Sequence, residues 1–152
     1  MKRCALLGSC LAMLLATVVV AADSKVDLTG IKCPVSGAPA KDIDGSSRDC
    51  HGGKVYFCCA NCPKKYDADK AKFATKANKQ LIDTKQAEEV KCPISGQDLN
   101  PDTAIEVSGT KVAFCCNMCK GKVEKAKGDE QLDLVFSDKA FDKGYKVKKA
   151  DK

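Results

Sequence analysis

The feature that most constrains this chain is a cysteine-rich phrase that occurs twice. Residues 57–62 read FCCANC, and residues 114–119 read FCCNMC. The match extends upstream, because IKCPVSGAP at 31–39 is similar to VKCPISGQD at 90–98. The first cysteine precedes the double cysteine by 25 positions in the first copy and by 23 in the second. A repeat of this length indicates two copies of one small structural unit.

Each copy contains the same succession of local structural signals. It opens with CPVSG or CPISG, where proline restricts the chain and glycine permits a positive φ, so a tight knuckle is expected. In the second copy, apolar residues alternate through AIEV and KVAFC around the turn SGT, which predicts a β-hairpin. In the first copy the turn is HGG. Beyond each double cysteine, over 64–73 and 120–127, the pattern becomes helical, with Pro63 in one first turn and Asn117 as the other N-cap.

These signals predict an α+β protein of two small units that are similar to zinc ribbons or treble clefs. Each unit would contain a cysteine knuckle, a β-hairpin and a short helix. Residues 76–89 lack glycine and proline, so they are predicted to form a helical connector whose helix ends near Thr84. The expected boundaries are a signal peptide at 1–22, a first unit at 31–75, the connector at 76–89, a second unit at 90–128 and a C-terminal extension at 129–152.

The C-terminal extension carries an apolar patch and one further helix signal. The patch consists of Leu132, Leu134, Val135, Phe136 and Phe141. Ser137 is the predicted cap of a last short helix that ends at Gly144. The lysine-rich tail at 146–152 is expected to fray.

The first 22 residues have the layout of a secretory signal peptide. Lys2 and Arg3 precede an apolar run that ends at Val20, and small residues follow at Ala21 and Ala22. We expect cleavage after Ala22, which gives a secreted or periplasmic protein of about 130 residues with no membrane attachment. The alternative is a retained membrane anchor, since the apolar run is nearly long enough to span a bilayer.

The charge pattern argues against nucleic acid as a partner. The formal net charge of +6 falls to +4 when Lys2 and Arg3 leave with the signal peptide. The remaining lysines alternate with Asp and Glu, and Arg48 is the only arginine left. A nucleic-acid interface combines clustered basic residues with aromatic ones. We therefore expect a solvated, lysine-rich surface.

The cysteine content requires an explanation in an exported chain. Of eleven cysteines, nine remain without Cys4 and Cys10, and an odd number cannot pair completely in internal disulfides. Units of about fifty residues bury little apolar surface, so they usually need disulfides or a metal. Small zinc modules bind their ion through thiolates that come from a knuckle and from a strand-to-helix junction. The cysteines common to both units are Cys33, Cys58, Cys59 and Cys62 in the first and Cys92, Cys115, Cys116 and Cys119 in the second.

The spacing ranks these candidate ligands. Cys58 and Cys62 lie four positions apart and share a face of the first helical turn, as do their counterparts in the second copy. Backbone N–H groups and the helix dipole at this end favour thiolates. Neighbours on an extended chain point in opposite directions, so Cys59 and Cys116 reach the ion only if the chain bends. They are the predicted fourth ligands; the alternatives are water, an exogenous ligand or a three-coordinate Cu(I) site.

Sulfur is the only ligand type repeated in both copies, which favours a soft metal. We expect one Zn(II) or Cu(I) per unit, with iron as a further candidate, because Ca(II) and Mg(II) prefer oxygen. Cys50 and His51 match Val107 and Ser108 of the second copy, so neither is a predicted ligand. His51 is expected to be a turn residue and Cys50 a buried thiol.

At these residues the chain resembles the TRASH and YHS class of small metal-binding domains. The resemblance lies in the knuckle, the hairpin and the FC…C motif with three intervening residues, and it covers 31–75 and 90–128. The second unit fits the TRASH spacing, whereas the first has a slightly longer loop. The YHS histidine is not reproduced at matching places, and the residue after the first junction cysteine is itself cysteine. The resemblance implies metal coordination, in a sensor, a transporter appendage or an accessory module for heavy-metal handling.

Two other functions compete with metal binding. A disulfide-stapled secreted interaction domain suits an exported chain, but one knuckle thiol and a cluster of three leave unpaired cysteines in both units. CANC and CNMC are each Cys-x-x-Cys at a helix start, which suggests a thiol–disulfide oxidoreductase. Neither unit, however, has the βαβ context of a thioredoxin-like fold. The sequence lacks a repeated histidine, a Ser/His/Asp set and a phosphate-binding glycine loop, so we predict that the protein is not an enzyme.

Overall fold

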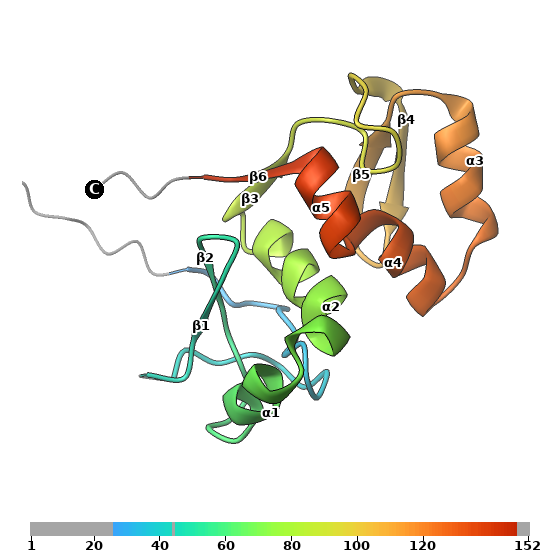
Figure 1. Ribbon diagram of the computed structural model, residues 1–152. Helices are drawn as coiled ribbons and strands as arrows, with labels where there is room; N and C mark the ends of the chain where they lie inside the picture. The colour runs from blue at the N-terminus through green and yellow to red at the C-terminus, as the bar shows by residue number, and fades with distance from the viewer. Residues whose placement is uncertain (1–25, 44, 149–152) are drawn as a thin grey trace, which may run out of the picture.

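The computed structural model describes residues 26–43 and 45–148. The predicted signal peptide at 1–22 and the last four residues lie outside the described residues. The described part contains five helices and three two-stranded antiparallel sheets (Figure 1). This arrangement confirms the predicted α+β class.

The first copy contains the predicted hairpin. Strands β1 (Arg48–Cys50) and β2 (Gly53–Val55) pair antiparallel. The two residues between them, His51 and Gly52, have positive φ values of 51° and 87°. Positive φ at both central positions matches the twist of a tight hairpin, and His51 is therefore a turn residue, as expected.

The helical segment of the first copy is interrupted, so the prediction of one helix over 64–73 is wrong. Helix α1 (Cys62–Ala68) ends before Asp69, and helix α2 (Lys70–Asp83) begins after it. Asp69 has a φ of −149°, and its Oδ1 accepts a hydrogen bond from the backbone N–H of Lys72 at 3.1 Å. This side chain caps the start of α2. The end of α2 agrees with the predicted end of the connector helix.

The second copy repeats the hairpin with longer strands. Strands β4 (Asn100–Val107) and β5 (Thr110–Phe114) pair antiparallel, as predicted. The intervening Ser108 and Gly109 have positive φ values of 50° and 85°, so both hairpins turn in the same way.

The caps of the later helices differ in part from the expectation. Helix α3 (Asn117–Lys125) has Cys116 in its N-cap position and no side-chain cap, so the prediction of Asn117 as N-cap is wrong. Ser137 does hold the N-cap position of helix α5 (Asp138–Gly144), but its side chain makes no capping hydrogen bond. Neither helix start is therefore closed by a side-chain cap.

The C-terminal extension contains more regular structure than the local signals indicate. The apolar patch forms helix α4 (Asp129–Phe136), and strand β6 (Tyr145–Val147) follows α5. Strand β6 pairs antiparallel with strand β3 (Ala87–Glu89), which directly precedes the second copy. The prediction that the tail frays is thus wrong for Lys146 and Val147.

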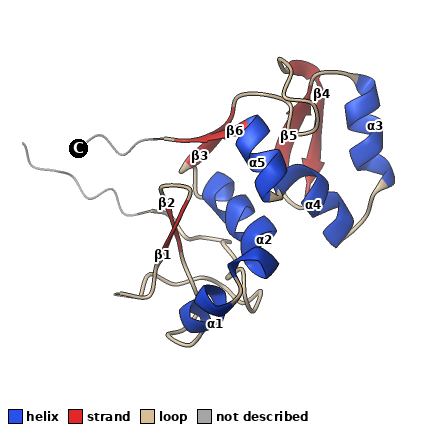
Figure 2. Cartoon of the chain, in the orientation of Figure 1, coloured by secondary structure: helices blue, strands red, loops and turns tan. Residues whose placement is uncertain are grey.

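One hydrophobic core contains side chains from both copies. Its fully buried members include Phe57 from the first copy, Leu81 from the connector, Phe114 from the second copy and Phe136 from the extension. Helix α2 lies between the first hairpin and helices α4 and α5 (Figure 2). Each copy keeps its own hairpin, while the interior is shared.

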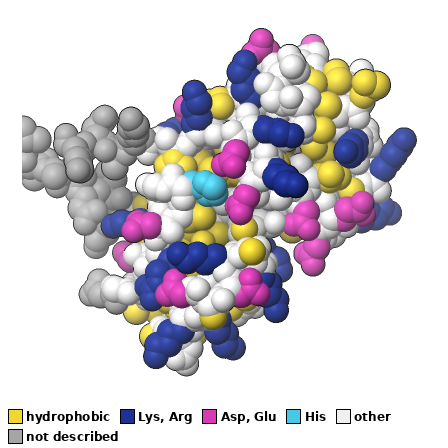
Figure 3. Space-filling view, in the orientation of Figure 1, with side chains coloured by type: hydrophobic (Ala, Val, Ile, Leu, Met, Phe, Trp, Pro, Cys, Tyr) yellow, Lys and Arg dark blue, Asp and Glu magenta, His cyan; other side chains and the backbone are white. Residues whose placement is uncertain are grey.

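The surface carries charges of both signs side by side. On the face seen in Figure 3, lysine and arginine side chains alternate with aspartate and glutamate. This pattern agrees with a solvated surface. Among the helices of the described residues, none has the length and apolar character that crossing a bilayer requires.

Candidate metal centres

The structure brings three cysteines together in each copy. The Sγ atoms of Cys33, Cys58 and Cys62 all lie within 4.8 Å of one another. Cys33 and Cys62 are buried, with 1% and 6% of their surfaces exposed, and Cys58 is half-buried. The thiols therefore converge on one point that is closed on the protein side and open on the other.

The second triad has the same construction. The Sγ atoms of Cys92, Cys115 and Cys119 also lie within 4.8 Å of one another. Cys92 is fully buried, whereas the other two are half-buried. The Sγ–Sγ distance across the first helical turn is 3.7 Å here and 3.6 Å for the corresponding pair of the first copy.

The predicted knuckles place the first cysteine of each triad. In the first copy, the N–H of Cys33 donates to the carbonyl of Ala38 at 2.8 Å, and the N–H of Gly37 donates back to the carbonyl of Cys33 at 2.9 Å. Cys92 and Gly96 repeat the second of these bonds at 2.7 Å. Both glycines have positive φ, 73° and 75°, which a side chain would oppose.

A buried phenylalanine fixes the other two cysteines of each triad. Phe57 and Phe114 have no exposed surface and directly precede the double cysteines. Cys62 is the first residue of α1, and Cys119 lies in the first turn of α3, so the helix start turns their thiols toward the knuckle. The buried ring anchors the chain next to the double cysteine, and the helix start places the last cysteine of the triad beside it.

A serine that the sequence analysis missed contacts each triad. Ser36 Oγ lies 3.1 Å from Cys58 Sγ, and Ser95 Oγ lies 3.2 Å from Cys115 Sγ. These serines occupy the same place in CPVSG and CPISG. The signal that could have found them is therefore their presence in both copies of the knuckle.

The triads hold unequal thiols. Burial raises the pKa of Cys33, but hydrogen bonds from Ser36 and from backbone N–H groups outweigh it and lower the pKa to about 7. Cys92 behaves in the same way, with Ser95 as its partner, and its pKa is also about 7. Burial and the neighbouring thiols raise the pKa of Cys62 and of Cys119 to about 12. The knuckle thiol of each triad is thus more acidic than the thiol on the helix, and a cation would neutralise the charge of its thiolate.

The structure does not gather Cys59 and Cys116 into the triads. Cys59 Sγ lies 3.5 Å from Cys62 Sγ, and Cys116 Sγ lies 3.6 Å from Cys115 Sγ. Cys116 has extended backbone, with φ −161° and ψ 168°, and its thiol contacts that of Cys115 without joining the group formed with Cys92 and Cys119. Backbone N–H groups at the helix start, with the neighbouring thiol, lower the pKa of both cysteines. Both stand at the rim as candidates for a fourth ligand.

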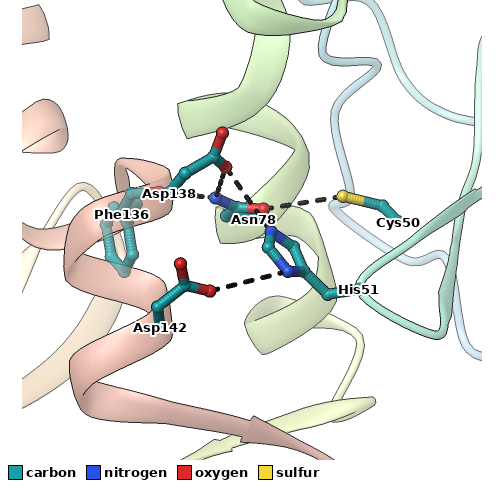
Figure 4. Close-up of polar contacts among 6 residues, drawn as sticks. All are labelled: Cys50, His51, Asn78, Phe136, Asp138 and Asp142. Carbon is teal, nitrogen blue, oxygen red and sulfur yellow. Dashed lines mark hydrogen bonds and ion pairs between the residues drawn. The ribbon is translucent and has the colours of Figure 1, made fainter.

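Cys50 and His51 lie away from both triads, in a polar network that links the first hairpin and α2 to the C-terminal extension (Figure 4). Cys50 is half-buried rather than buried, and its Sγ donates to Asn78 Oδ1 at 3.6 Å. Burial raises the pKa of this thiol, which makes it a poor nucleophile. His51 lies between Asp138 and Asp142, with its ring nitrogens 3.5 and 3.9 Å from their Oδ1 atoms.

The donor set fits a soft cation better than a hard one. Each triad offers sulfur alone, with all nine cysteines of the described part present as free thiols. Zn(II) and Cu(I) accept such ligands, whereas Ca(II) and Mg(II) require oxygen. The two clusters are therefore candidate centres for a soft metal ion. Comparisons of the chain with family models, with curated proteins and with solved structures find no match.

Proposed function

We propose that the protein is an exported two-site metal-binding protein, whose two TRASH/YHS-like units each hold one Zn(II) or Cu(I) ion through cysteine thiolates. The observation that carries the proposal is the convergence of three Sγ atoms within 4.8 Å, found once in each copy. A chance cluster would not be expected to recur with the same knuckle, hairpin and helix start. The proposed role is accessory metal handling, or a structural contribution of the ions to a small fold.

The partial exposure of the centres supports exchange of the ion with the surroundings. Cys58 and Cys115 are half-buried, and the rim thiols Cys59 and Cys116 lie beside them. A fully enclosed structural site would leave no such path. The knuckle thiols supply the fixed, buried side of each centre, and the rim thiols are suited to receive or release an ion.

A second candidate is a thiol–disulfide oxidoreductase. The observation in its favour is the Cys59–Cys62 pair, whose Sγ atoms lie 3.5 Å apart at the start of α1. The pKa of Cys59 is lowered and that of Cys62 is raised to about 12, as in a reactive thiol with a resolving partner. Two thiols of the first triad, Cys33 and Cys58, have no part in such a pair, so we place this function second.

One experiment separates the two functions and the disulfide-stapled alternative. Protein without the signal peptide is purified anaerobically, and bound metal and free thiols are counted before and after a strong chelator. Two metal equivalents, with thiols released by chelation, support the proposal. Metal-free protein with oxidised cysteine pairs supports a disulfide-stapled domain, and turnover of a disulfide substrate supports the oxidoreductase.

Single substitutions test whether the centres are separate. Cys62→Ser and Cys119→Ser should each remove one metal equivalent and leave the other. Cys50→Ser is the matched control, because it removes a thiol outside both triads. Loss of both ions from either triad variant would contradict two independent centres.

A further inference from the structure

The two candidate centres have the same thiols but differ in one neighbouring side chain. The backbone N–H of Tyr56, two residues before Cys58, donates to Gln80 Oε1 at 2.6 Å. At the equivalent place in the second copy, the N–H of Ala113 donates to Glu89 Oε2 at 2.9 Å. A neutral amide in the first copy is thus replaced by a carboxyl group in the second.

Both polar atoms of the Gln80 side chain form hydrogen bonds. It is 2% exposed, and its Nε2 donates to the carbonyls of Lys32 and Tyr56, both at 2.9 Å. Lys32 directly precedes the knuckle ligand Cys33. The side chain therefore ties α2 to the knuckle and to the strand that leads to the double cysteine, without adding charge.

Glu89 uses only one of its two carboxyl oxygens, Oε2, in the hydrogen bond to Ala113. Its Oε1 is buried without a hydrogen-bond partner in the described part of the chain, and so is the hydroxyl of Tyr145. These two residues are opposite each other in the β3–β6 pair. Burial, and then the nearby Cys92 thiolate, raise the pKa of Glu89 to about 7, although the Ala113 N–H opposes the change. An ionisable group thus lies within electrostatic range of the second centre.

The end of α5 holds β3 tightly against the second knuckle. The carbonyl of Gly144 accepts hydrogen bonds from the N–H groups of Val90 at 2.7 Å and Lys91 at 3.0 Å. A Cβ at Gly144 would lie 2.8 Å from the Cα of Pro93, so no side chain fits there. The position of Glu89 relative to Cys92 is therefore fixed by backbone contacts.

We propose that Glu89 makes the second centre more selective than the first for a divalent over a monovalent soft cation. This inference rests on the proposed function. Three thiolates with Zn(II) carry a net charge of −1, whereas three thiolates with Cu(I) carry −2. A buried carboxylate repels the second assembly more strongly, and Gln80 exerts no such force on the first centre. The two assemblies differ by one unit of charge. For that charge at about 10 Å from the carboxylate, in a medium of effective dielectric constant about 20, the ratio of Zn(II) to Cu(I) affinity changes by roughly tenfold.

The test measures the affinity of each centre for Zn(II) and for Cu(I) by competition with chelators at pH 8. Cys119→Ser isolates the first centre, and Cys62→Ser isolates the second. We expect the ratio of Zn(II) to Cu(I) affinity to be about tenfold higher at the second centre. Glu89→Gln should remove that difference, because Gln80 shows that an amide fits the equivalent place.

Glu88→Gln is the matched control. Glu88 is the exposed neighbour on the same strand, pairs with Lys148 and loses the same charge. Gln80→Glu is the reciprocal variant and should raise the ratio at the first centre, provided that a thermal melt shows it folded. If Glu89→Gln changes the ratio no more than Glu88→Gln while both centres bind metal, the inference is overturned and the proposed function stands. If neither centre of the unsubstituted chain binds Zn(II) or Cu(I), both are overturned.

Discussion

Ser36 Oγ lies 3.1 Å from Cys58 Sγ, so a hydroxyl of the first knuckle contacts a thiol that stands 22 positions later in the chain. The same Oγ accepts the backbone N–H of Ala38 at 3.3 Å, which leaves its own proton free to point toward sulfur. Ser95 repeats both contacts in the second copy, with Cys115 and Gln97. Each knuckle is thus linked to its junction by a contact between protein side chains.

This link predicts the effect of Ser36→Ala on the metal-free protein. Loss of the hydroxyl removes a hydrogen bond that lowers the pKa of Cys33, so that pKa should rise from about 7 toward its ordinary value of 9.0. The free energy of unfolding should fall by about 0.5–1.5 kcal/mol. Thiolate absorbance in the ultraviolet and urea denaturation measure the two effects. Ser137→Ala is the control, because the Ser137 side chain makes no capping bond; equal changes in both variants would contradict the assignment.

The thiol pKa values predict how the stability of the metal-free protein depends on pH. The pKa values of Cys33 and Cys92 are about 7 in the folded protein, whereas the ordinary value of 9.0 applies in the unfolded chain. At pH values between these two pKa values, the folded state therefore binds fewer protons than the unfolded state. The free energy of unfolding should therefore rise from pH 7 to pH 9. Cys62 and Cys119, with pKa values raised to about 12, act in the opposite sense, and stability should fall again above pH 9.

Urea denaturation under reducing, metal-free conditions at a series of pH values measures this profile. In a Cys33→Ser, Cys92→Ser double variant the rise between pH 7 and pH 9 should be smaller. A free energy of unfolding that declines steadily from pH 7 to pH 9 in the unsubstituted chain would contradict the assigned shifts.

Glu89 predicts a second pH window. Its pKa is raised from 4.5 to about 7 by burial, so its contribution to stability is complete below pH 4.5 and is lost as the pH rises through 7. Glu89→Gln should flatten the fall in the free energy of unfolding over this range. Glu88→Gln, at the exposed neighbour, should leave the fall unchanged. A Glu89→Gln profile that matches that of the unsubstituted chain between pH 4.5 and pH 7 would contradict the burial of the charge.

The elements that could be predicted from the sequence are those fixed by local signals. Gly37 and Gly96 adopt the positive φ that the knuckles need, and the residue pairs at 51–52 and 108–109 form the same two-residue turns. Alternating apolar residues around those turns specify the strands. The grouping of three cysteines per copy follows, because a knuckle and a helix start on either side of a hairpin meet at its open end.

Other elements depend on contacts between distant segments of the chain, and no local sequence signal predicts them. Strand β3 is only AEE, a poor strand former by composition, and it pairs with β6 more than fifty positions later, with Glu89 opposite Tyr145. The helical sequence pattern continues on both sides of Asp69. In the sequence, Asp69 therefore resembles an ordinary solvent-facing helix residue, although the helix is interrupted there. The equivalence of Gln80 and Glu89 is hidden because one comes from a helix and the other from a strand.

The close approach at Gly144 predicts opposite results for two glycine-to-alanine substitutions. A Cβ at Gly144 would lie 2.8 Å from the Cα of Pro93 and 2.9 Å from the carbonyl oxygen of Lys91, whereas one at Gly121 would meet nothing within 4 Å. Gly144→Ala should cost about 1–3 kcal/mol of unfolding free energy through overpacking and should weaken metal binding at the second centre only. Gly121→Ala, inside α3, should add about 0.5–1 kcal/mol. Urea denaturation and metal titration measure both; a stable Gly144→Ala with unchanged affinity would contradict the contact.

Asn78 joins α2 to the C-terminal extension through hydrogen bonds that involve no metal ligand. It has no exposed surface, and its Nδ2 donates to the carbonyl of Phe136 at 3.0 Å and to Asp138 Oδ1 at 2.8 Å. Asn78→Ala leaves that buried carbonyl without this donor, which should cost about 1–3 kcal/mol in the free energy of unfolding. The exposed Asn61, whose side chain makes no capping bond, is the control, and Asn61→Ala should change stability by less than about 0.5 kcal/mol.

The Asn78 substitution also separates the interface from the centres. Because the thiols of each triad come from within one copy, Asn78→Ala should still bind two equivalents of metal while the metal-free protein unfolds at lower urea concentration. Metal content of the folded variant and its urea midpoint are the two measurements. Loss of either ion would mean that the centres depend on how α2 packs against the extension, and an unchanged midpoint would mean that these hydrogen bonds do not stabilise that packing.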